Sequence, residues 1–174
     1  TAKLISKSKV IGWFQGRMEV GARALGNRSI IANPIDPKIQ DIVNQKVKFR
    51  EKWRPFCPST IDKYAKDYFI YDHPLPYMIV ACDVKPGVAD ILPSVVHVDN
   101  TVRVQSVLKD QNKRFYSLIE YFGELTGHHV VLNTSFNIKG EPIVLSPEDA
   151  VNCFLKTDID VLVLGDFIVT KDKS

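Results

Sequence analysis

The sequence has few cysteines, little excess charge of either sign and no long apolar run. Its three cysteines, Cys57, Cys82 and Cys153, lie far apart and form no CxxC pair. This spacing argues against a disulfide framework or a zinc site and favours a reduced, cytoplasmic location. The formal net charge of +3 is too small to indicate binding to nucleic acid or to a membrane surface. No apolar stretch approaches the length of a membrane span, so we expect neither nucleic acid nor a membrane among the partners.

The sequence does contain enough apolar residues for one packed domain. Hydrophobic residues make up 45% and charged residues 25% of the 174 positions, which predicts one ordered domain over residues 1–174. The chain begins at Thr1 rather than at a methionine, and the segment from Thr1 to Ser8 has the pattern of the end of a helix. We therefore expect a fragment of a longer protein, cut at a domain boundary.

Three helices are predicted from their end signals and their apolar spacing. The first begins with Asp36 as N-cap and Pro37 in its first turn. The second runs from about Asn112 to a C-cap at Gly127, and the third begins with a capping box at residues 146–149. The residues expected on the buried faces are Ile39, Ile42, Val43 and Val47 in the first helix, Phe115, Leu118, Ile119, Phe122 and Leu125 in the second, and Val151, Phe154 and Leu155 in the third.

Short apolar or alternating runs predict strands between these helices. The predicted ranges are 10–14, 77–81, 101–107, 130–132 and 160–165. In the range 101–107, alternation places Arg103 and Gln105 on the same face of one strand. Strands and helices are mixed without a regular βαβ order, which favours an α+β fold with a mixed β-sheet and flanking helices.

The first candidate motif is the segment from Gln15 to Ser29, which follows a predicted strand. Its three glycines allow the backbone to approach a ligand closely, and its three arginines can donate paired hydrogen bonds to phosphate or carboxylate. The pattern is also compatible with a turn whose arginines contact Glu19 and solvent. This segment alone does not decide between the two interpretations.

A second, cationic segment runs from Val47 to Phe56. On an extended backbone Lys48 and Arg50 would point to the same side, with Phe49 facing the core, and the pair would suit an anionic group. A solvated basic stretch after a helix is the alternative, and for such a segment by itself it is the more frequent case.

Two further segments place polar groups beside predicted strands. Arg103 on a sheet needs a carboxylate or a ligand anion as its partner. His97 beside Asp99 is more often a structural hydrogen-bonding residue than an acid or a base. Ser135 and Asn137, on one side by alternation, offer a hydroxyl and an amide to phosphate or ribose oxygens, although an Asx or Ser turn is the alternative. Together the four segments favour phosphoryl or adenylyl chemistry over a hydrolase triad, because they supply cations and donors but almost no nucleophile.

The four segments resemble the signature of the C-terminal domain of the O-carbamoyltransferase family that includes nodulation-factor and antibiotic carbamoyltransferases. The matching runs are GRME and RALGNRS within 16–29, KFRE and RPF within 48–56, HVD and RVQ within 97–105, and LNTSFN and GEP within 132–142. The resemblance extends from about residue 10 to residue 164 and keeps the order of the motifs. Ala22 departs from the family pattern, where proline is usual, and Cys57 and Asn100 replace small residues.

That C-terminal domain is similar to the YrdC-type domain, whose Lys-x-Arg and Ser-x-Asn motifs match residues 48–50 and 135–137. The resemblance implies that carbamoyl phosphate is cleaved, that the carbamate attacks the α-phosphate of ATP, and that carbamoyl-adenylate forms with release of pyrophosphate. Magnesium (Mg2+) would arrive with ATP rather than occupy a metal site of its own. A separate, metal-bearing N-terminal Kae1-like domain would then pass the carbamoyl group to an acceptor hydroxyl, so full transfer is not expected from this domain alone.

The same resemblance assigns the site residues. Those expected around carbamoyl phosphate are Arg23, Lys48, Arg54 and Arg103. Those expected at the nucleotide phosphates are Ser135 and Asn137, with Arg50 helping at either place. The expected catalytic residues are Lys48, Arg50 and Arg103. Two alternatives remain open: synthesis of threonylcarbamoyl-adenylate for transfer RNA modification, and a non-catalytic ligand-binding or scaffold domain.

Overall fold

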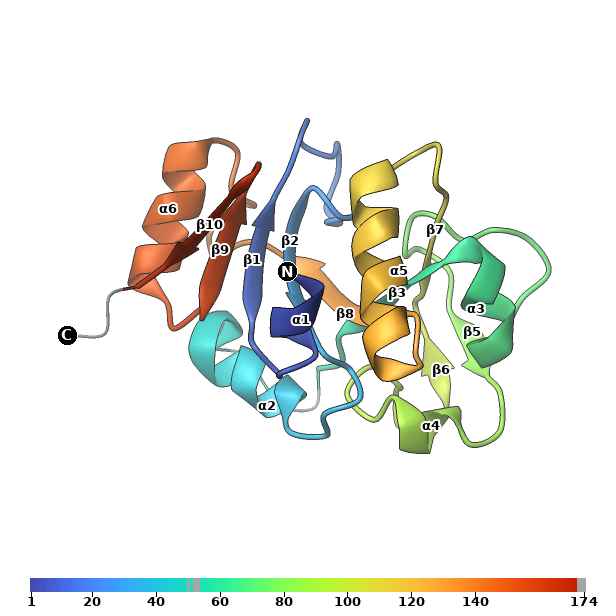
Figure 1. Ribbon diagram of the computed structural model, residues 1–174. Coiled ribbons are helices and arrows are strands. Elements are labelled where there is room, and N and C mark those ends of the chain that lie inside the picture. The colour runs from blue at the N-terminus through green and yellow to red at the C-terminus, as the bar shows by residue number, and fades with distance from the viewer. Residues whose placement is uncertain (50, 52–53, 172–174) are drawn as a thin grey trace.

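The computed structural model describes residues 1–49, 51 and 54–171. Within these ranges a seven-stranded mixed sheet forms the centre of the molecule (Figure 1). Its strand order is β10-β9-β1-β2-β8-β3-β7. The strands are β1 (Ile11–Phe14), β2 (Arg28–Ala32), β3 (Cys57–Ile61), β7 (Gln105–Val107), β8 (Val130–Ser135), β9 (Val161–Leu164) and β10 (Phe167–Thr170).

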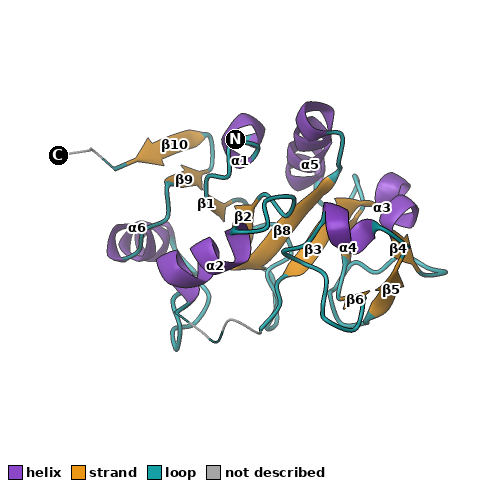
Figure 2. Ribbon diagram, turned by 90° about the horizontal axis from the view of Figure 1, so that it is seen from below, coloured by secondary structure: helices purple, strands orange, loops and turns teal. Residues whose placement is uncertain are grey.

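Helices cover both faces of this sheet, as Figure 2 shows. The helices on one face are α1 (Ala2–Ile5) and α5 (Lys113–Thr126), and those on the other are α2 (Ile39–Val43) and α6 (Pro147–Lys156). A smaller sheet of β4 (Phe69–Ile70), β5 (Cys82–Val84) and β6 (Thr101–Val102) lies to one side with α3 (Asp62–Tyr68) and α4 (Val88–Ile91). None of the described helices is long and apolar enough to span a membrane.

The two faces of the large sheet carry separate buried clusters, because successive strand side chains point in opposite directions. On β1, Ile11 and Trp13 pack with the buried side chains of α5, whereas Phe14 belongs to the cluster on the opposite face. On β9, Val163 belongs to the cluster that contains the α5 side chains, and Leu162 belongs to the cluster that contains Phe14. Burial on both faces explains why these strands are almost continuously apolar in sequence.

The predicted ends of the two longer helices are confirmed. The side chain of Asn112 caps α5, and Gly127 ends it in the left-handed conformation with φ 79°. Ser146 and Asp149 form the predicted capping box of α6. Three apolar residues assigned to buried helix faces are nevertheless exposed: Leu125, Val151 and Leu155.

The first predicted helix begins later than expected. Asp36 is not its N-cap, because its carboxylate accepts a hydrogen bond from the backbone N–H of Lys38 at 2.9 Å within a turn, and α2 begins at Ile39. After α2 the chain continues as a π-helix, Asn44–Lys48. Local turn chemistry at the aspartate therefore replaced the first helical turn that the sequence predicts.

The extended Lys-x-Arg arrangement predicted for residues 48–50 is wrong at its first two positions. Lys48 is the last residue of the π-helix, and Phe49 follows in the left-handed conformation with φ 45°. Phe49 is 53% exposed instead of facing the core. Arg50 lies outside the described residues.

Two strand predictions also fail. The range 77–81 is an irregular loop in which Tyr77, Ile79 and Val80 are exposed, so its apolar residues do not pair with the sheet. The range 101–107 is divided between β6 and β7, which belong to different sheets. Arg103 lies at this break and does not share a strand with Gln105.

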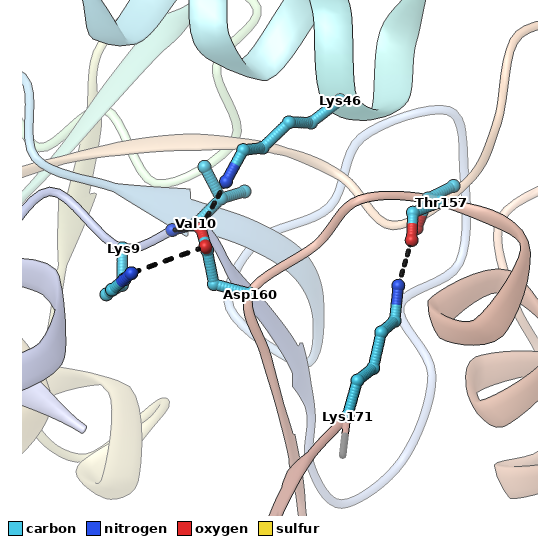
Figure 3. A network of polar contacts seen from close by, with 6 residues as sticks. All are labelled: Lys9, Val10, Lys46, Thr157, Asp160 and Lys171. Carbon is cyan, nitrogen blue, oxygen red and sulfur yellow. Dashed lines mark hydrogen bonds and ion pairs between the residues drawn. The ribbon is translucent and has the colours of Figure 1, made fainter. Parts of the chain in front are cut away.

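Asp160 joins three segments beside the parallel pair β1 and β9. Its Oδ2 accepts hydrogen bonds from the backbone N–H of Val10 at 2.9 Å and from Nζ of Lys46 at 2.8 Å, and Nζ of Lys9 lies 3.6 Å from Oδ1 (Figure 3). Burial by itself would raise the pKa of Asp160, but these hydrogen bonds and positive charges outweigh it and lower the pKa. The carboxylate therefore stabilises the folded state in its ionised form.

We predict that Asp160→Asn lowers the free energy of unfolding by about 1–3 kcal/mol at pH 7, because a neutral amide loses the charge-assisted hydrogen bonds. Since the folded-state pKa lies below the unfolded value of about 3.9, the stabilisation is present above that pH and is lost as the pH falls through the folded-state pKa. Denaturant unfolding at pH 7 and pH 3 measures both values. Asp166→Asn, in a largely exposed ion pair with Arg114, should change stability little at either pH. A difference for Asp160→Asn that stays undiminished at pH 3 would contradict the prediction.

Candidate functional site

A small polar cavity lies where several loops meet the end of β8. Its volume is about 100 Å³, and Arg23 and Arg103 line it together with Asn133, Thr134 and Ser135. The rest of its lining is Ala22, Ala24, residues 55–57 and Met78. This arginine cavity brings together three residues that the sequence assigned to the site, Arg23, Arg103 and Ser135.

Glu19 and Arg28 hold the loop that carries Arg23. Oε1 of Glu19 accepts hydrogen bonds from the backbone N–H groups of Leu25 at 2.8 Å and Asn27 at 2.7 Å. Arg28 is buried, and its guanidinium lies 3.5 Å from the centre of the Phe14 ring. The same guanidinium donates to the backbone carbonyl oxygens of residues 15, 16, 27 and 145. Arg28 is thus a structural residue, and of the three arginines in this segment only Arg23 lines the cavity.

Lys48, Ser135 and Asn137 form a second cluster, which we call the lysine cluster. Lys48 is only 5% exposed, and its Nζ lies 3.1 Å from Oγ of Ser135 and 2.7 Å from Oδ1 of Asn137. The backbone carbonyl oxygens of Ser135 and Asn137 also accept hydrogen bonds from Nζ. The hydroxyl of Ser135 donates to Oδ1 of Asn137 at 2.7 Å. The two sequence motifs therefore form one contiguous unit, built from the end of the π-helix and the end of β8.

Phe136, between the serine and the asparagine, anchors this unit to the sheet. Its ring is fully buried and packs directly over Gly12 of β1. A Cβ atom at Gly12 would lie 2.8 Å from Cζ of Phe136, which is closer than carbon atoms normally approach. Gly12 thus provides the space that lets the aromatic ring hold Ser135 and Asn137 in place.

A larger cavity of about 580 Å³ is lined in part by Glu141, which Asn137 of the lysine cluster contacts. Residues 141–145 and α6 form most of its lining. Asn137 contacts this wall, because its Nδ2 donates to the carbonyl oxygen of Glu141 at 2.7 Å. Cys153 also lines the cavity, but burial raises its pKa to about 11, so its thiol is a poor nucleophile at neutral pH. Ser135 thus borders the arginine cavity, and Asn137 contacts the wall of the larger one.

The remaining predicted residues lie apart from these contacts. Arg54 is exposed and does not line the arginine cavity, although the three residues that follow it do. Arg50 is outside the described part of the chain. Nδ1 of His97 lies 3.1 Å from the hydroxyl of Thr101, and burial lowers the pKa of this imidazole, which fits the structural role. Asn133 lines the cavity but was not predicted as a site residue, although it lies in the polar run after an apolar strand and within the LNTSFN motif.

The described residues contain no group of three or more His, Cys, Asp and Glu side chains that could hold a metal ion. The cations and amides of the two clusters are instead suited to anions. A buried lysine surrounded by oxygen acceptors and two arginines that line a small cavity thus gather positive charge in one part of this α+β domain.

Comparison with known proteins identifies the family to which this α+β domain belongs. Residues 2–171 match the family model described as "Carbamoyltransferase C-terminus", and the chain is a member of this family. The chain is 42% identical to nodulation protein NolO of Bradyrhizobium diazoefficiens, over 98% of this chain and 32% of that protein. It is 35% identical to nodulation protein U of Rhizobium tropici, over 87% of this chain and 26% of that protein. The chain thus spans about a quarter to a third of the length of the curated relatives it matches.

A solved structure shares the fold. The chain resembles full-length HypF in the phosphate- and nucleotide-bound form, with a TM-score of 0.64 and 18% identity over 95% of this chain and 24% of that one. At this identity the likeness establishes the fold alone. It agrees with the predicted α+β class, a mixed sheet with flanking helices of the YrdC-like type, and the predicted family resemblance is likewise confirmed.

We predict that Gly12→Ala lowers the free energy of unfolding by about 1–3 kcal/mol, because the added methyl group overlaps the Phe136 ring. A smaller side chain at position 136 should relieve the overlap. The double variant Gly12→Ala with Phe136→Leu should therefore be more stable than the sum of the two single losses implies. Urea unfolding of the wild type and the three variants measures this coupling, and strictly additive losses would refute the assigned contact.

Proposed function

We propose that this domain binds carbamoyl phosphate and ATP and converts them into carbamoyl-adenylate, as the activating part of a larger carbamoyltransferase. Membership of the carbamoyltransferase family supports carbamoyl transfer in general. The observation that carries the specific proposal is the arginine cavity, in which Arg23 and Arg103 from distant segments face one small space beside Ser135.

The arginine cavity suits carbamoyl phosphate in size and charge. Its volume of about 100 Å³ fits a ligand of a few heavy atoms rather than a nucleotide. Guanidinium groups donate paired hydrogen bonds that match the oxygens of a phosphate, and two of them neutralise a dianion. Arg23 and Arg103 are therefore proposed to hold the phosphate group. Arg54 and Arg50, in the segment leading to residues 55–57 of the lining, remain proposed further donors.

The larger cavity suits the nucleotide. Its volume of about 580 Å³ lies within the range typical of small-molecule sites, and residues 142–145 give it an apolar wall. Asn137 contacts that wall through Glu141, and Ser135 lines the arginine cavity. We therefore place the nucleoside in the larger cavity and the α-phosphate next to the lysine cluster, within reach of a carbamate formed in the arginine cavity.

The proposed chemistry has two steps. Water cleaves carbamoyl phosphate into carbamate and inorganic phosphate. A carbamate oxygen then forms a bond to the α-phosphorus of ATP, the bond from that phosphorus to the bridging oxygen of the β-phosphate breaks, and pyrophosphate leaves with the electron pair. Lys48 and Arg103 are proposed to stabilise the negative charge that develops during these displacements. Magnesium would enter bound to the ATP phosphates, and a second domain would carry out transfer to an acceptor hydroxyl.

We predict that Arg23→Ala and Arg103→Ala each weaken binding of carbamoyl phosphate by about 10- to 100-fold, since each removes charge-assisted hydrogen bonds. Arg17→Ala is the matched control, because Arg17 is an exposed arginine of the same loop that does not line the cavity. Isothermal titration calorimetry measures the affinities, and circular dichroism verifies folding. Equal affinities for all four proteins would place the anion site elsewhere.

We predict that Asn137→Ala lowers ATP affinity and pyrophosphate release by about 10-fold, while carbamoyl phosphate affinity stays within about 3-fold of the wild-type value. Ser135→Ala should reduce both affinities, because Ser135 belongs to the lysine cluster and also lines the arginine cavity. Titration with each ligand, together with a pyrophosphate assay containing magnesium, separates the two variants. An equal loss of both ligands in Asn137→Ala would show that the subsites are assigned wrongly.

A further inference from the structure

Asn133 is a buried residue in the wall of the arginine cavity. Its amide nitrogen has several hydrogen-bond partners, whereas its amide oxygen has none among the described residues. It lies on β8 opposite Ile31 of β2 and Cys57 of β3 and is only 1% exposed. Its Nδ2 is within hydrogen-bond distance of Oγ of Ser59 at 2.9 Å and Oε1 of Gln105 at 3.2 Å, and of one backbone carbonyl at 3.3 Å. Its Oδ1 is buried without a hydrogen-bond partner among residues 1–49, 51 and 54–171.

The neighbours of Asn133 determine which way its amide faces. Nε2 of Gln105 donates to the carbonyl oxygen of Leu25 at 2.8 Å, which leaves Oε1 of Gln105 facing Ser59 and Asn133. Oγ of Ser59 gives its proton to that oxygen at 2.8 Å and therefore accepts from Asn133. All three neighbours of Nδ2 are acceptors, so exchanging the amide nitrogen and oxygen of Asn133 would bring oxygen against oxygen. The unpaired group is therefore an acceptor.

A buried acceptor without a donor is costly and rare in folded proteins, and a bound ligand is one way to satisfy it. The charged groups of the cavity, the guanidinium groups of Arg23 and Arg103, can only donate, whereas the hydroxyls of Thr134 and Ser135 can donate or accept. The complementary ligand therefore carries anionic oxygens together with an N–H donor. A carbamoyl phosphate molecule has both: phosphate oxygens for the arginines and one amino group.

We infer that Oδ1 of Asn133 accepts a hydrogen bond from the amino group of the carbamoyl moiety, which makes Asn133 the residue that distinguishes carbamoyl phosphate from other acyl phosphates. This inference rests on the proposed function of the cavity. Acetyl phosphate carries a methyl group where carbamoyl phosphate carries the amino group, and a methyl group leaves the acceptor unpaired. A site built around a polar group of the substrate discriminates against the analogue that lacks it.

Competition between acyl phosphates tests the inference without any substitution. The wild-type domain should bind carbamoyl phosphate roughly 10- to 100-fold more tightly than acetyl phosphate, as measured by calorimetry, with inorganic phosphate as the reference anion. Equal affinity for the two acyl phosphates would overturn the inference and leave the anion site intact. Failure to bind carbamoyl phosphate and inorganic phosphate alike would instead refute the proposed function on which the inference rests.

Substitution of Asn133 tests whether this residue causes the preference for carbamoyl phosphate over acetyl phosphate. Asn133→Ala should bring the two acyl phosphates to within about 3-fold of each other by weakening carbamoyl phosphate alone, with affinity for inorganic phosphate unchanged. Thr60→Val is the matched control for lost stability, because Thr60 is a buried residue of the adjacent strand whose hydroxyl donates to the carbonyl oxygen of His129 outside the cavity. It should keep the wild-type preference. Retention of the full preference by folded Asn133→Ala would overturn the assignment.

Discussion

The site depends on the burial of one ammonium group, that of Lys48. A buried lysine is tolerated only where oxygen atoms replace its lost hydration, and here the side chains and backbone carbonyls of Ser135 and Asn137 surround it. The end of β8 must therefore lie against the end of the π-helix, although the two are far apart in sequence. π-Helical turns occur frequently at functional sites. This one ends at Lys48 and places its ammonium group beside the oxygen atoms of Ser135 and Asn137.

The mixed sheet holds these groups in register. β8 pairs antiparallel with β2 on one side and with β3 on the other, so its polar end lies between the loops that precede those two strands. The first loop carries Arg23, and the second leads into the cavity lining at residues 55–57. Arg103 enters from the break between β6 and β7. The sheet thus positions several loops so that their side chains line one small cavity. Loops held by a rigid scaffold commonly carry the binding residues of a protein.

Chemically identical residues serve different purposes because of their surroundings. Arg28 and Arg23 are five positions apart in one motif. Arg28 donates hydrogen bonds to backbone carbonyls and contacts the Phe14 ring, whereas Arg23 lines the cavity. Two polar residues of β8 also differ in their surroundings: Asn133 joins a buried amide network and Ser135 joins the lysine cluster. Composition and spacing do not distinguish such residues, because their roles depend on contacts with distant segments. The prediction of an extended backbone at Lys48 failed for the same reason.

The sequence by itself determined the features whose causes are local. The ends of α5 and α6 follow from side chains that cap the adjacent backbone, such as Asn112 and Ser146, and the order of the motifs indicated the family. Only the tertiary structure decided that the apolar run at 77–81 is a loop, and that Lys48 bonds to Ser135 and Asn137. Those outcomes depend on which distant strand or side chain lies opposite, and periodicity specifies the face of an element but not its neighbour.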